Sequence, residues 1–177
     1  MGHLSTIVTV FEDRLMQYAQ ESAKGISDAQ FARLPQGSHG AIDTNHPAFI
    51  FGHLSVYPEM LMGLIGVEGA TGMNSPDDFK TLFLHGNPCR DDPDGSIYPS
   101  KEVIMSHFFK TYKAGYAAIA EQTDDFLAQA MDKSENEFVS GFPSRGALSA
   151  FMLGAHPFLH IGQLSAWRRC MGLGPIF

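Results

Sequence analysis

Apolar residues recur at intervals of three and four along four long segments of this chain. The segments are 4–24, 45–66, 99–122 and 144–171. This spacing places the apolar side chains of each segment on one face of an α-helix. The sequence contains no sustained alternation typical of β-strands. Because four amphipathic helices bury their apolar faces best against one another, we expect an all-α fold, a four-helix bundle forming one domain over residues 1–177.

Turn-forming residues set the limits of the second segment and predict a kink within it. Asn45 is expected to cap its N-terminus, and Pro47 suits the first helical turn. Pro58 lies inside the helix and predicts a kink, because its ring nitrogen carries no N–H. The tract 69–99 is rich in Gly, Pro, Asn and Asp and predicts a long connection.

Three shorter helices and a loop are expected between the long segments. The short helices are predicted at 27–33, 76–84 and 124–131, and a polar loop is predicted from there to Phe142.

Composition and charge exclude several classes of protein. A hydrophobic fraction of 44% in 177 residues is enough for a real core. The net charge of −7 argues against a nucleic-acid partner, which requires a concentrated basic surface. No stretch approaches the roughly 20 apolar residues needed to cross a bilayer, and no signal peptide is evident. Two isolated cysteines, Cys89 and Cys170, suit a reducing cytoplasm.

Two histidines in the fourth segment have the spacing of a chelating pair. His156 and His160 are four residues apart, so they project from the same face of a helix. Two neutral imidazoles arranged in this way can bind one transition-metal ion. Buried imidazoles need partners for their nitrogens, and the alternative is a hydrogen-bonded pair without a metal. The predicted inward stripe comprises Leu148, Met152, Ala155, His156, Leu159, His160, Gln163 and Trp167.

A third ligand must come from another helix. His53 lies on the apolar face of the second segment and is the best candidate. His107 in the third segment is the alternative, either as a fourth ligand or as a core histidine bonded to a carbonyl. His46 lies one heptad before His53, about 10 Å along the axis, which is too far to share the ion. It would line a pocket mouth or occupy the first helical turn. Solvent exposure is expected for the remaining histidines, His3, His39 and His85.

These motifs resemble those of the DinB-like superfamily. The resemblance is carried by Gly52-His53-Leu54, by the string His156-Pro157-Phe158-Leu159-His160-Ile161-Gly162-Gln163-Leu164, and by Arg168-Arg169 and Gly172 downstream. It implies an up-down-down-up four-helix bundle of DinB/YfiT-like type, with a long crossover between the second and third helices. It also implies a metal site formed by His53, His156 and His160, and a homodimer.

One residue departs from the family pattern. Pro157 lacks the N–H that would bond the carbonyl of Leu153, which predicts a bend just before His160.

Three protein ligands would leave coordination positions open, which is the pattern of catalytic metal sites. The ion could activate a water molecule or a thiolate. The resemblance implies a metal-dependent enzyme, a thiol-dependent S-transferase or a hydrolase. The expected cofactor of such an enzyme is a divalent transition metal (Zn, Ni, Fe or Mn). Its expected substrate is a small molecule such as a low-molecular-weight thiol. The alternatives are a non-catalytic metal-stabilised bundle and a metal-free helical dimer.

Candidates for supporting roles are fewer. Tyr57 and Gln163 would lie near the ligands and are the pocket candidates. Glu59 could act as a general base only if the kink at Pro58 turned it inward; a solvated carboxylate is the default. Arg168 and Arg169 could bind a carboxylate, with one of them forming a structural ion pair. The sequence lacks HExxH and Glu-x-x-His motifs, which argues against zincin and ferritin-like di-iron sites.

Overall fold

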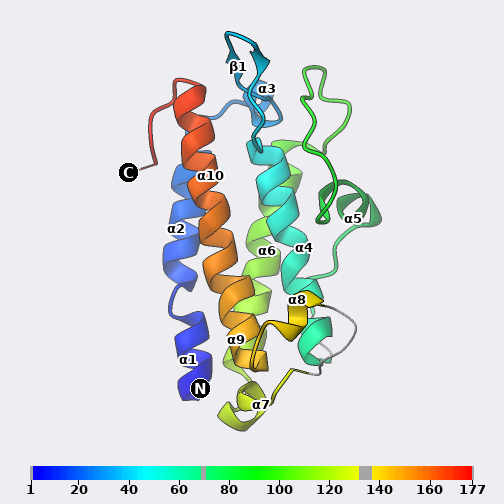
Figure 1. Ribbon diagram of the computed structural model, residues 1–177, viewed down its shortest axis with the longest axis vertical. Coiled ribbons are helices and arrows are strands. Elements are labelled where there is room, and N and C mark those ends of the chain that lie inside the picture. Colours follow the sequence, from blue (N-terminus) through cyan, green and yellow to red (C-terminus); the bar gives the residue numbers. More distant parts are fainter. Residues whose placement is uncertain (1, 69–70, 132–136, 177) are drawn as a thin grey trace.

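Most of the chain is helical, and the computed structural model describes residues 2–68, 71–131 and 137–176. The predicted all-α class is confirmed. Within the described residues, four long helical segments lie along the longest axis of the molecule (Figure 1). In chain order they are α1 (His3–Thr9) with α2 (Glu12–Ala23), α4 (Pro47–Ile65), α6 (Lys101–Ala120), and α9 (Arg145–Ala150) with the π-helical η1 (Phe151–Ala155) and α10 (His156–Cys170).

Short elements connect the long segments. Each of the three predicted short helices contains an observed one, namely α3 (Asp28–Phe31), α5 (Asp77–Phe83) and α7 (Asp124–Ala128). A small hairpin pairs β1 (Gln36–Gly37) with antiparallel β2 (Gly40–Ala41). This hairpin lies at the end of the molecule where α4 begins (Figure 1).

The predicted polar loop before Phe142 contains a further helix, α8 (Glu137–Ser140), so the loop prediction is wrong there. The ring of Phe138 packs edge-on against Phe142 and Phe151, at centroid distances of 5.3 and 5.8 Å. The contact with Phe151, which lies in the fourth helical segment, is not visible in the local composition. Residues 132–136 of the predicted loop lie outside the described residues.

The first long segment is divided into two helices, where the sequence predicts one. α1 ends at Thr9 and α2 begins at Glu12. The break follows five consecutive β-branched residues, 6–10, whose restricted side chains disfavour a continuous helix. As a result, α1 packs against α6 and α9, whereas α2 packs mainly against α10.

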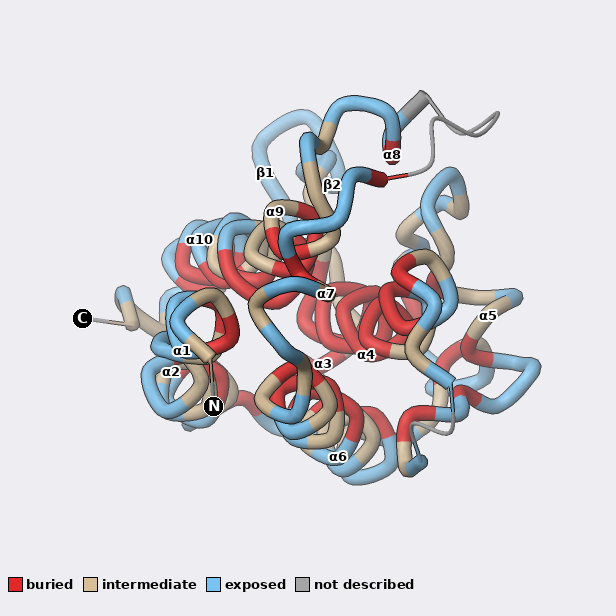
Figure 2. The backbone as a smooth tube through the Cα atoms, turned by 90° about the horizontal axis from the view of Figure 1, so that it is seen from below, coloured by how far each residue is buried: buried red, intermediate tan, exposed pale blue. Residues whose placement is uncertain are grey.

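The chain rises through α1 and α2, descends through α4 and again through α6, and rises through α10 (Figure 1). α4 packs against α6 and α5, and α10 packs against α2 and α4. Figure 2 shows α4 at the centre, buried on most sides. The prediction that no stretch approaches the length and apolarity needed to cross a bilayer is wrong for α4, which would suffice by these two criteria. However, 78% of its apolar window is buried inside the protein, as is usual for a core helix.

His46 caps the N-terminus of α4, where the sequence predicts Asn45. Its ring Nδ1 accepts a hydrogen bond from the backbone N–H of Phe49 at 3.1 Å, and its Nε2–H donates to the carbonyl of Arg90 at 2.8 Å. The imidazole therefore satisfies one unpaired N–H of the first turn and ties the helix to the long 69–99 connection. Burial lowers the pKa of His46 below 6.5, although the bond to Arg90 opposes this shift.

This cap makes stability depend on pH. In the unfolded chain His46 takes up a proton as the pH falls through 6.5, whereas the buried ring stays neutral to lower pH. The unfolded state therefore binds more protons, and the free energy of unfolding falls below pH 6.5. We expect His46→Asn to lower the free energy of unfolding by about 1 kcal/mol at pH 7.5. The difference between wild type and variant should shrink by about 1 kcal/mol at pH 5.5. Urea unfolding of both proteins with chelator present measures it, and a difference that does not vary with pH would contradict the cap.

A π-helical turn precedes Pro157. In η1 the N–H of His156 bonds the carbonyl of Phe151, five residues earlier. This wider turn holds one extra residue and accommodates the proline at the start of α10. The sequence correctly predicts that Pro157 cannot donate a hydrogen bond to the carbonyl of Leu153. It does not predict that the helix accommodates the proline through a π-turn.

The extra residue changes which side chains of α10 face the core. The predicted stripe is correct for Leu148, Met152 and Trp167, which are buried, and wrong for Ala155, Leu159 and Gln163, which are exposed. After the π-turn the buried positions include Pro157, Ile161, Leu164 and Arg168, each one residue later than the stripe implies. His156 and His160 are therefore half-buried, at the edge of the packed face.

Tyr116 on α6 supplies the hydrogen bond that Pro157 cannot. Its phenol O–H donates to the carbonyl of Leu153, the group left without a partner by the proline. Burial raises the pKa of Tyr116, so the phenol remains protonated and can donate. Tyr112, one turn earlier on α6, is also fully buried, but its hydroxyl has no hydrogen-bond partner among the described residues.

These two tyrosines form a matched pair for mutation. We expect Tyr116→Phe to lower the free energy of unfolding by about 1–3 kcal/mol, because the Leu153 carbonyl would be buried without a donor. Tyr112→Phe removes a hydroxyl without a partner and is expected to be neutral or stabilising. Urea denaturation of both variants measures the effect. Equal losses in the two variants would show that the Leu153 bond has no special role.

Candidate metal centre

Three histidines from two helices converge at one point. His53 lies near the middle of α4, and His156 and His160 lie on the first two turns of α10. One ring nitrogen of each lies within 4.8 Å of the other two, and the Nε2 atoms of His156 and His160 are 3.1 Å apart. Nitrogens bound to one zinc ion at about 2.0–2.1 Å in a tetrahedron are about 3.3 Å from each other. The three predicted ligands therefore lie close enough to bind a metal.

The protein holds two of the rings in an orientation that suits coordination. His53 Nδ1 lies 2.7 Å from the carbonyl oxygen of Phe83. Since a carbonyl can only accept, the proton lies on Nδ1 and the Nε2 lone pair is free. His160 Nδ1 donates in the same way to Gln163 Oε1 at 2.9 Å. Metal-binding histidines usually donate their second ring N–H to an oxygen acceptor.

His156 is held by ring contacts. Its imidazole is stacked on Phe151 at 5.8 Å and contacts Tyr57 edge-on at 4.6 Å. Its buried Nδ1 has no hydrogen-bond partner among the described residues. Within this part of the chain His156 therefore lacks the second ring hydrogen bond that orients most metal-binding imidazoles, and its Nε2 is the nitrogen that faces His160. The set of three neutral nitrogen donors fits a bound transition-metal ion.

Burial keeps the three imidazoles neutral. It lowers the pKa of His53 to about 4, with His160 and His85 nearby adding to the shift and the Phe83 carbonyl opposing it. Burial is the main cause that lowers the pKa of His156 to about 3, and the neighbouring His160 and His53 add to this shift. Burial also lowers the pKa of His160. At neutral pH each ring therefore offers a lone pair, and no proton has to be displaced by a cation.

The two predicted pocket residues lie at the cluster. Tyr57 is buried, with its ring edge-on to His53 at 4.7 Å and to His156. Gln163 is exposed and accepts hydrogen bonds from His160 and, at 3.4 Å, from the Asn45 side chain. The structure thus places Tyr57 against two of the rings and Gln163 as the residue that orients the third.

We expect Gln163→Leu to weaken zinc binding about tenfold, because losses of 10- to 100-fold are typical when such an orienting partner is removed. Competition with a chromophoric chelator measures the affinity. Gln20→Leu, on the exposed face of α2, is the control and should bind zinc like the wild type. An unchanged affinity in Gln163→Leu would contradict its orienting role.

The other histidine candidates lie elsewhere. His107 Nε2 lies 3.2 Å from the Ser75 hydroxyl, and its ring contacts Phe79 at 4.7 Å. His107 is therefore outside the described metal-ligand group, and its partner is a hydroxyl, where the prediction was a carbonyl. His46 is the helix cap described above. His3, His39 and His85 are exposed, as expected.

The charged candidates form structural contacts. Glu59 accepts from Lys80 at 2.9 Å and from the N–H of Ser75 at 2.8 Å, so it is ion-paired where the default prediction was a solvated group. Arg168 is buried and donates to the carbonyls of Ser22 and Lys24 at 2.9 and 2.7 Å.

Among the described residues Arg168 has no carboxylate partner, and the three ion pairs found there do not include it. The prediction of an ion pair is therefore wrong for Arg168. Its guanidinium satisfies carbonyls at the C-terminal end of α2. Arg169 is exposed.

Sequence reasoning missed the contact between α5 and the site. The carbonyl that orients His53 belongs to Phe83, thirty residues away. Gly52 allows this contact, because a Cβ at that position would lie 2.5 Å from the Phe83 ring. Gly52 in the Gly-His-Leu motif was the available signal, although the sequence does not show which residue packs against it.

Comparison of the chain with models of known protein families, with curated proteins and with solved structures gave no match. Membership of the DinB-like superfamily therefore stays a proposal, supported by the motifs and by the histidine geometry.

Proposed function

We propose that this protein is a DinB-like, metal-dependent enzyme built on an up-down-down-up four-helix bundle. His53, His156 and His160 would hold one divalent transition-metal ion. The observation that carries the proposal is the convergence of three ring nitrogens within 4.8 Å of one another. The hydrogen bonds from His53 and His160 to Phe83 and Gln163 support it, because they leave lone pairs free for a cation.

The donor set favours a borderline ion. Three neutral imidazoles suit Zn, Ni or Fe better than Mg or Ca, which prefer oxygen ligands; Mn is the least favoured of the predicted metals. The cluster found among the described residues includes no carboxylate or thiolate. Three protein ligands also match the ligand count of catalytic zinc sites, in which a further position is left for water or substrate.

The proposed chemistry is transfer of a small thiol or hydrolysis of a small molecule. When bound, the ion would supply Lewis acidity and lower the pKa of a coordinated water or thiol. Burial raises the pKa of Tyr57, so its phenol would stay protonated and able to donate a hydrogen bond to a substrate. Gln163 would hold the His160 ring in its coordinating orientation.

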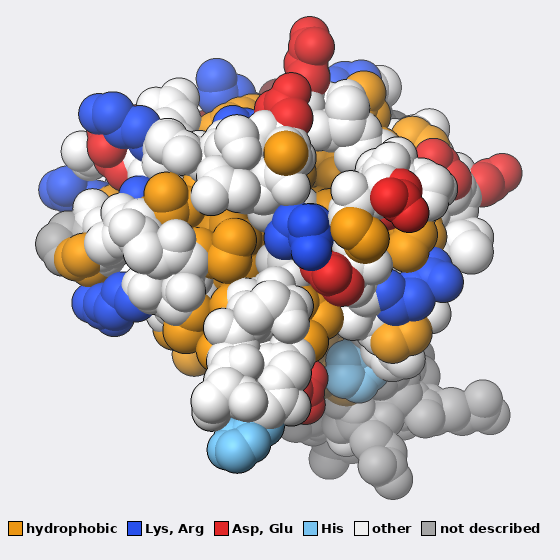
Figure 3. Space-filling model, turned by 90° about the horizontal axis from the view of Figure 1, so that it is seen from above, with side chains coloured by type: hydrophobic (Ala, Val, Ile, Leu, Met, Phe, Trp, Pro, Cys, Tyr) orange, Lys and Arg blue, Asp and Glu red, His pale blue; other side chains and the backbone are white. Residues whose placement is uncertain are grey.

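The proposal includes a cytoplasmic homodimer without nucleic-acid or membrane partners. The net charge of −7 supports the absence of nucleic acid. Figure 3 gives further support, because lysine and arginine side chains on the face that it shows are scattered among acidic and apolar ones. Light scattering during size-exclusion chromatography tests the dimer, and only a 19.4 kDa species would contradict it.

A non-catalytic role for the ion is the second candidate. It is favoured by the position of the ligands, which come from both α4 and α10 and include the buried His53. An ion there would tie the two helices together and stabilise the fold by binding only the native state.

Cobalt substitution distinguishes the two candidates. Tag-free protein is loaded with Co²⁺, its absorption spectrum is recorded, and glutathione or cysteine is then added. An enzyme with an open position should show a new thiolate charge-transfer band, together with metal-dependent thiol transfer or amide hydrolysis that His160→Ala abolishes. A metal-raised melting temperature with an unchanged spectrum and no activity would support the structural role.

A further inference from the structure

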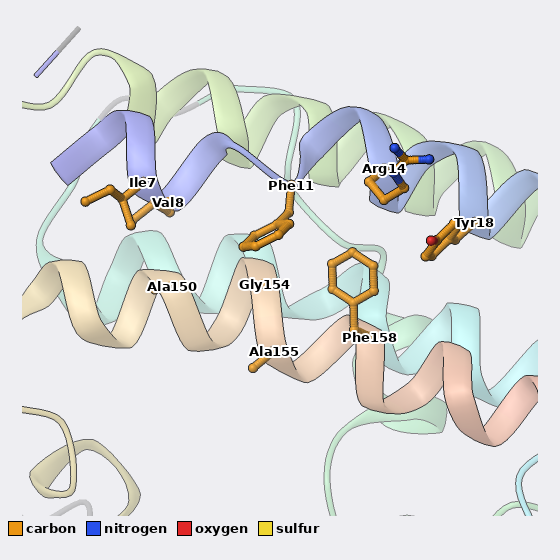
Figure 4. A pocket seen from close by; sticks show the side chains of 9 residues that line it. All are labelled: Ile7, Val8, Phe11, Arg14, Tyr18, Ala150, Gly154, Ala155 and Phe158. Carbon is orange, nitrogen blue, oxygen red and sulfur yellow. The ribbon is translucent and has the colours of Figure 1, made fainter. Parts of the chain in front are cut away.

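A groove separate from the histidine cluster runs between the N-terminal helices and the fourth helical segment (Figure 4). Its volume is about 490 Å³, within the range of small-molecule sites. Ile7 and Phe11 line one side, and Gly154, Ala155 and Phe158 line the other. None of the three ligand histidines is among the residues that line it.

Small residues of the π-turn leave this space open. A Cβ built on Gly154 would meet no atom within 4 Å. Ala155 and Ala150 fill little of the remaining space. Aromatic rings come from both sides of the groove, since Phe11 from the N-terminal side and Phe158 from the fourth segment meet edge-on at 5.9 Å, and Phe11 is 51% exposed.

The groove is elongated and has one charged end. Ile7 and Val8 lie at one end, and Arg14 and Tyr18 at the other (Figure 4). Eleven residues separate Ile7 from Tyr18, which corresponds to about 16 Å along helices. A linear apolar chain would fit this shape better than a compact ligand.

Arg14 provides a cation at the charged end. Its guanidinium donates to Gln17 Oε1 at 3.1 Å and lies 5.8 Å from the centre of the Tyr18 ring. No carboxylate pairs with it within the part of the chain that the structure describes. An arginine beside an apolar groove is suited to a carboxylate, which it can bind with two parallel hydrogen bonds.

We propose that this groove binds a linear amphiphile with an aliphatic chain and one terminal carboxylate. The chain would lie along Phe11 and Phe158 toward Ile7, and the carboxylate would pair with Arg14. A purely apolar partner, including the apolar face of a second copy, would cover the arginine without supplying a counter-charge. The charge at one end therefore favours a fatty-acid-like ligand.

Calorimetry of the full chain with sodium decanoate, below its micellar concentration, tests the proposal. Decanol, which has the same chain without the charge, is the matched ligand. We expect Arg14→Gln to weaken decanoate binding about tenfold and to leave decanol binding unchanged. Gly154→Leu should weaken both ligands at least about tenfold by filling the groove. Arg169→Gln, an exposed arginine on α10 outside the groove, is the control and should have no effect.

Three outcomes would overturn the proposal. The first is no decanoate binding to the wild type. The second is equal binding to Arg14→Gln and wild type, which would remove the role of the cation. The third is a dimer, seen by sedimentation velocity, that Phe11→Glu dissociates and that excludes decanoate, because the groove would then be an interface between copies. Arg14 is exposed, so its substitution tests the proposal even if Gly154→Leu does not fold.

Discussion

Replacing His53 by alanine is expected to lower zinc affinity more than about 100-fold, beyond the 10- to 100-fold typical of losing an orienting partner. His53 is the ligand from α4, and its loss leaves only the pair on α10. Two imidazoles four residues apart can still chelate, but without the third donor and the Phe83 bond the site is incomplete. Competition with a chromophoric chelator measures the change.

His107→Gln is the matched control for this variant. His107 is half-buried and hydrogen-bonded, like His156 and His160, but it contacts Ser75 outside the cluster. Zinc affinity should stay within about twofold of wild type, since no ligand or orienting group is altered. A similar loss in both variants would point to a general effect of the substitutions on the fold and would contradict a specific role for His53.

Gly52→Ala is expected to affect both stability and the metal site. The new methyl group would lie 2.5 Å from the Phe83 ring, which therefore has to move away from α4. Overpacking of this kind costs about 1–3 kcal/mol of unfolding free energy. Because the Phe83 carbonyl orients His53, we also expect zinc affinity to fall about tenfold. Urea unfolding and chelator competition give the two values.

Gly63→Ala on the same helix separates packing from helix propensity. A Cβ at Gly63 meets no atom within 4 Å, and the residue is exposed. This change should stabilise the protein by about 0.5–1 kcal/mol and leave zinc binding unaltered. If Gly52→Ala were also stabilising, the close approach of Phe83 to α4 would be wrong.

Local periodicity was sufficient to predict the helical class and the long helices. The apolar spacing in segments 45–66 and 99–122 corresponds to α4 and α6 within about two residues at each end. Helix ends vary by this amount between definitions. The chelating pair was also predictable, since two residues four apart share a helix face whatever the tertiary structure.

The rest depends on contacts between residues distant in sequence. The π-turn before Pro157 inserts one residue, and this shifts the buried face from Gln163 to Leu164. Periodicity assumes an uninterrupted α-helix and cannot include that shift. The bond from Tyr116 to the Leu153 carbonyl and the carbonyl partners of Arg168 likewise join separate elements.

X-ray absorption spectroscopy of the zinc-loaded protein, purified without a histidine tag, tests most directly whether three imidazoles share one cation. We predict one equivalent of zinc with three imidazole nitrogens at about 2.0–2.1 Å. Less than about a tenth of an equivalent after zinc addition, or an ion with fewer than three imidazole ligands, would contradict the shared site.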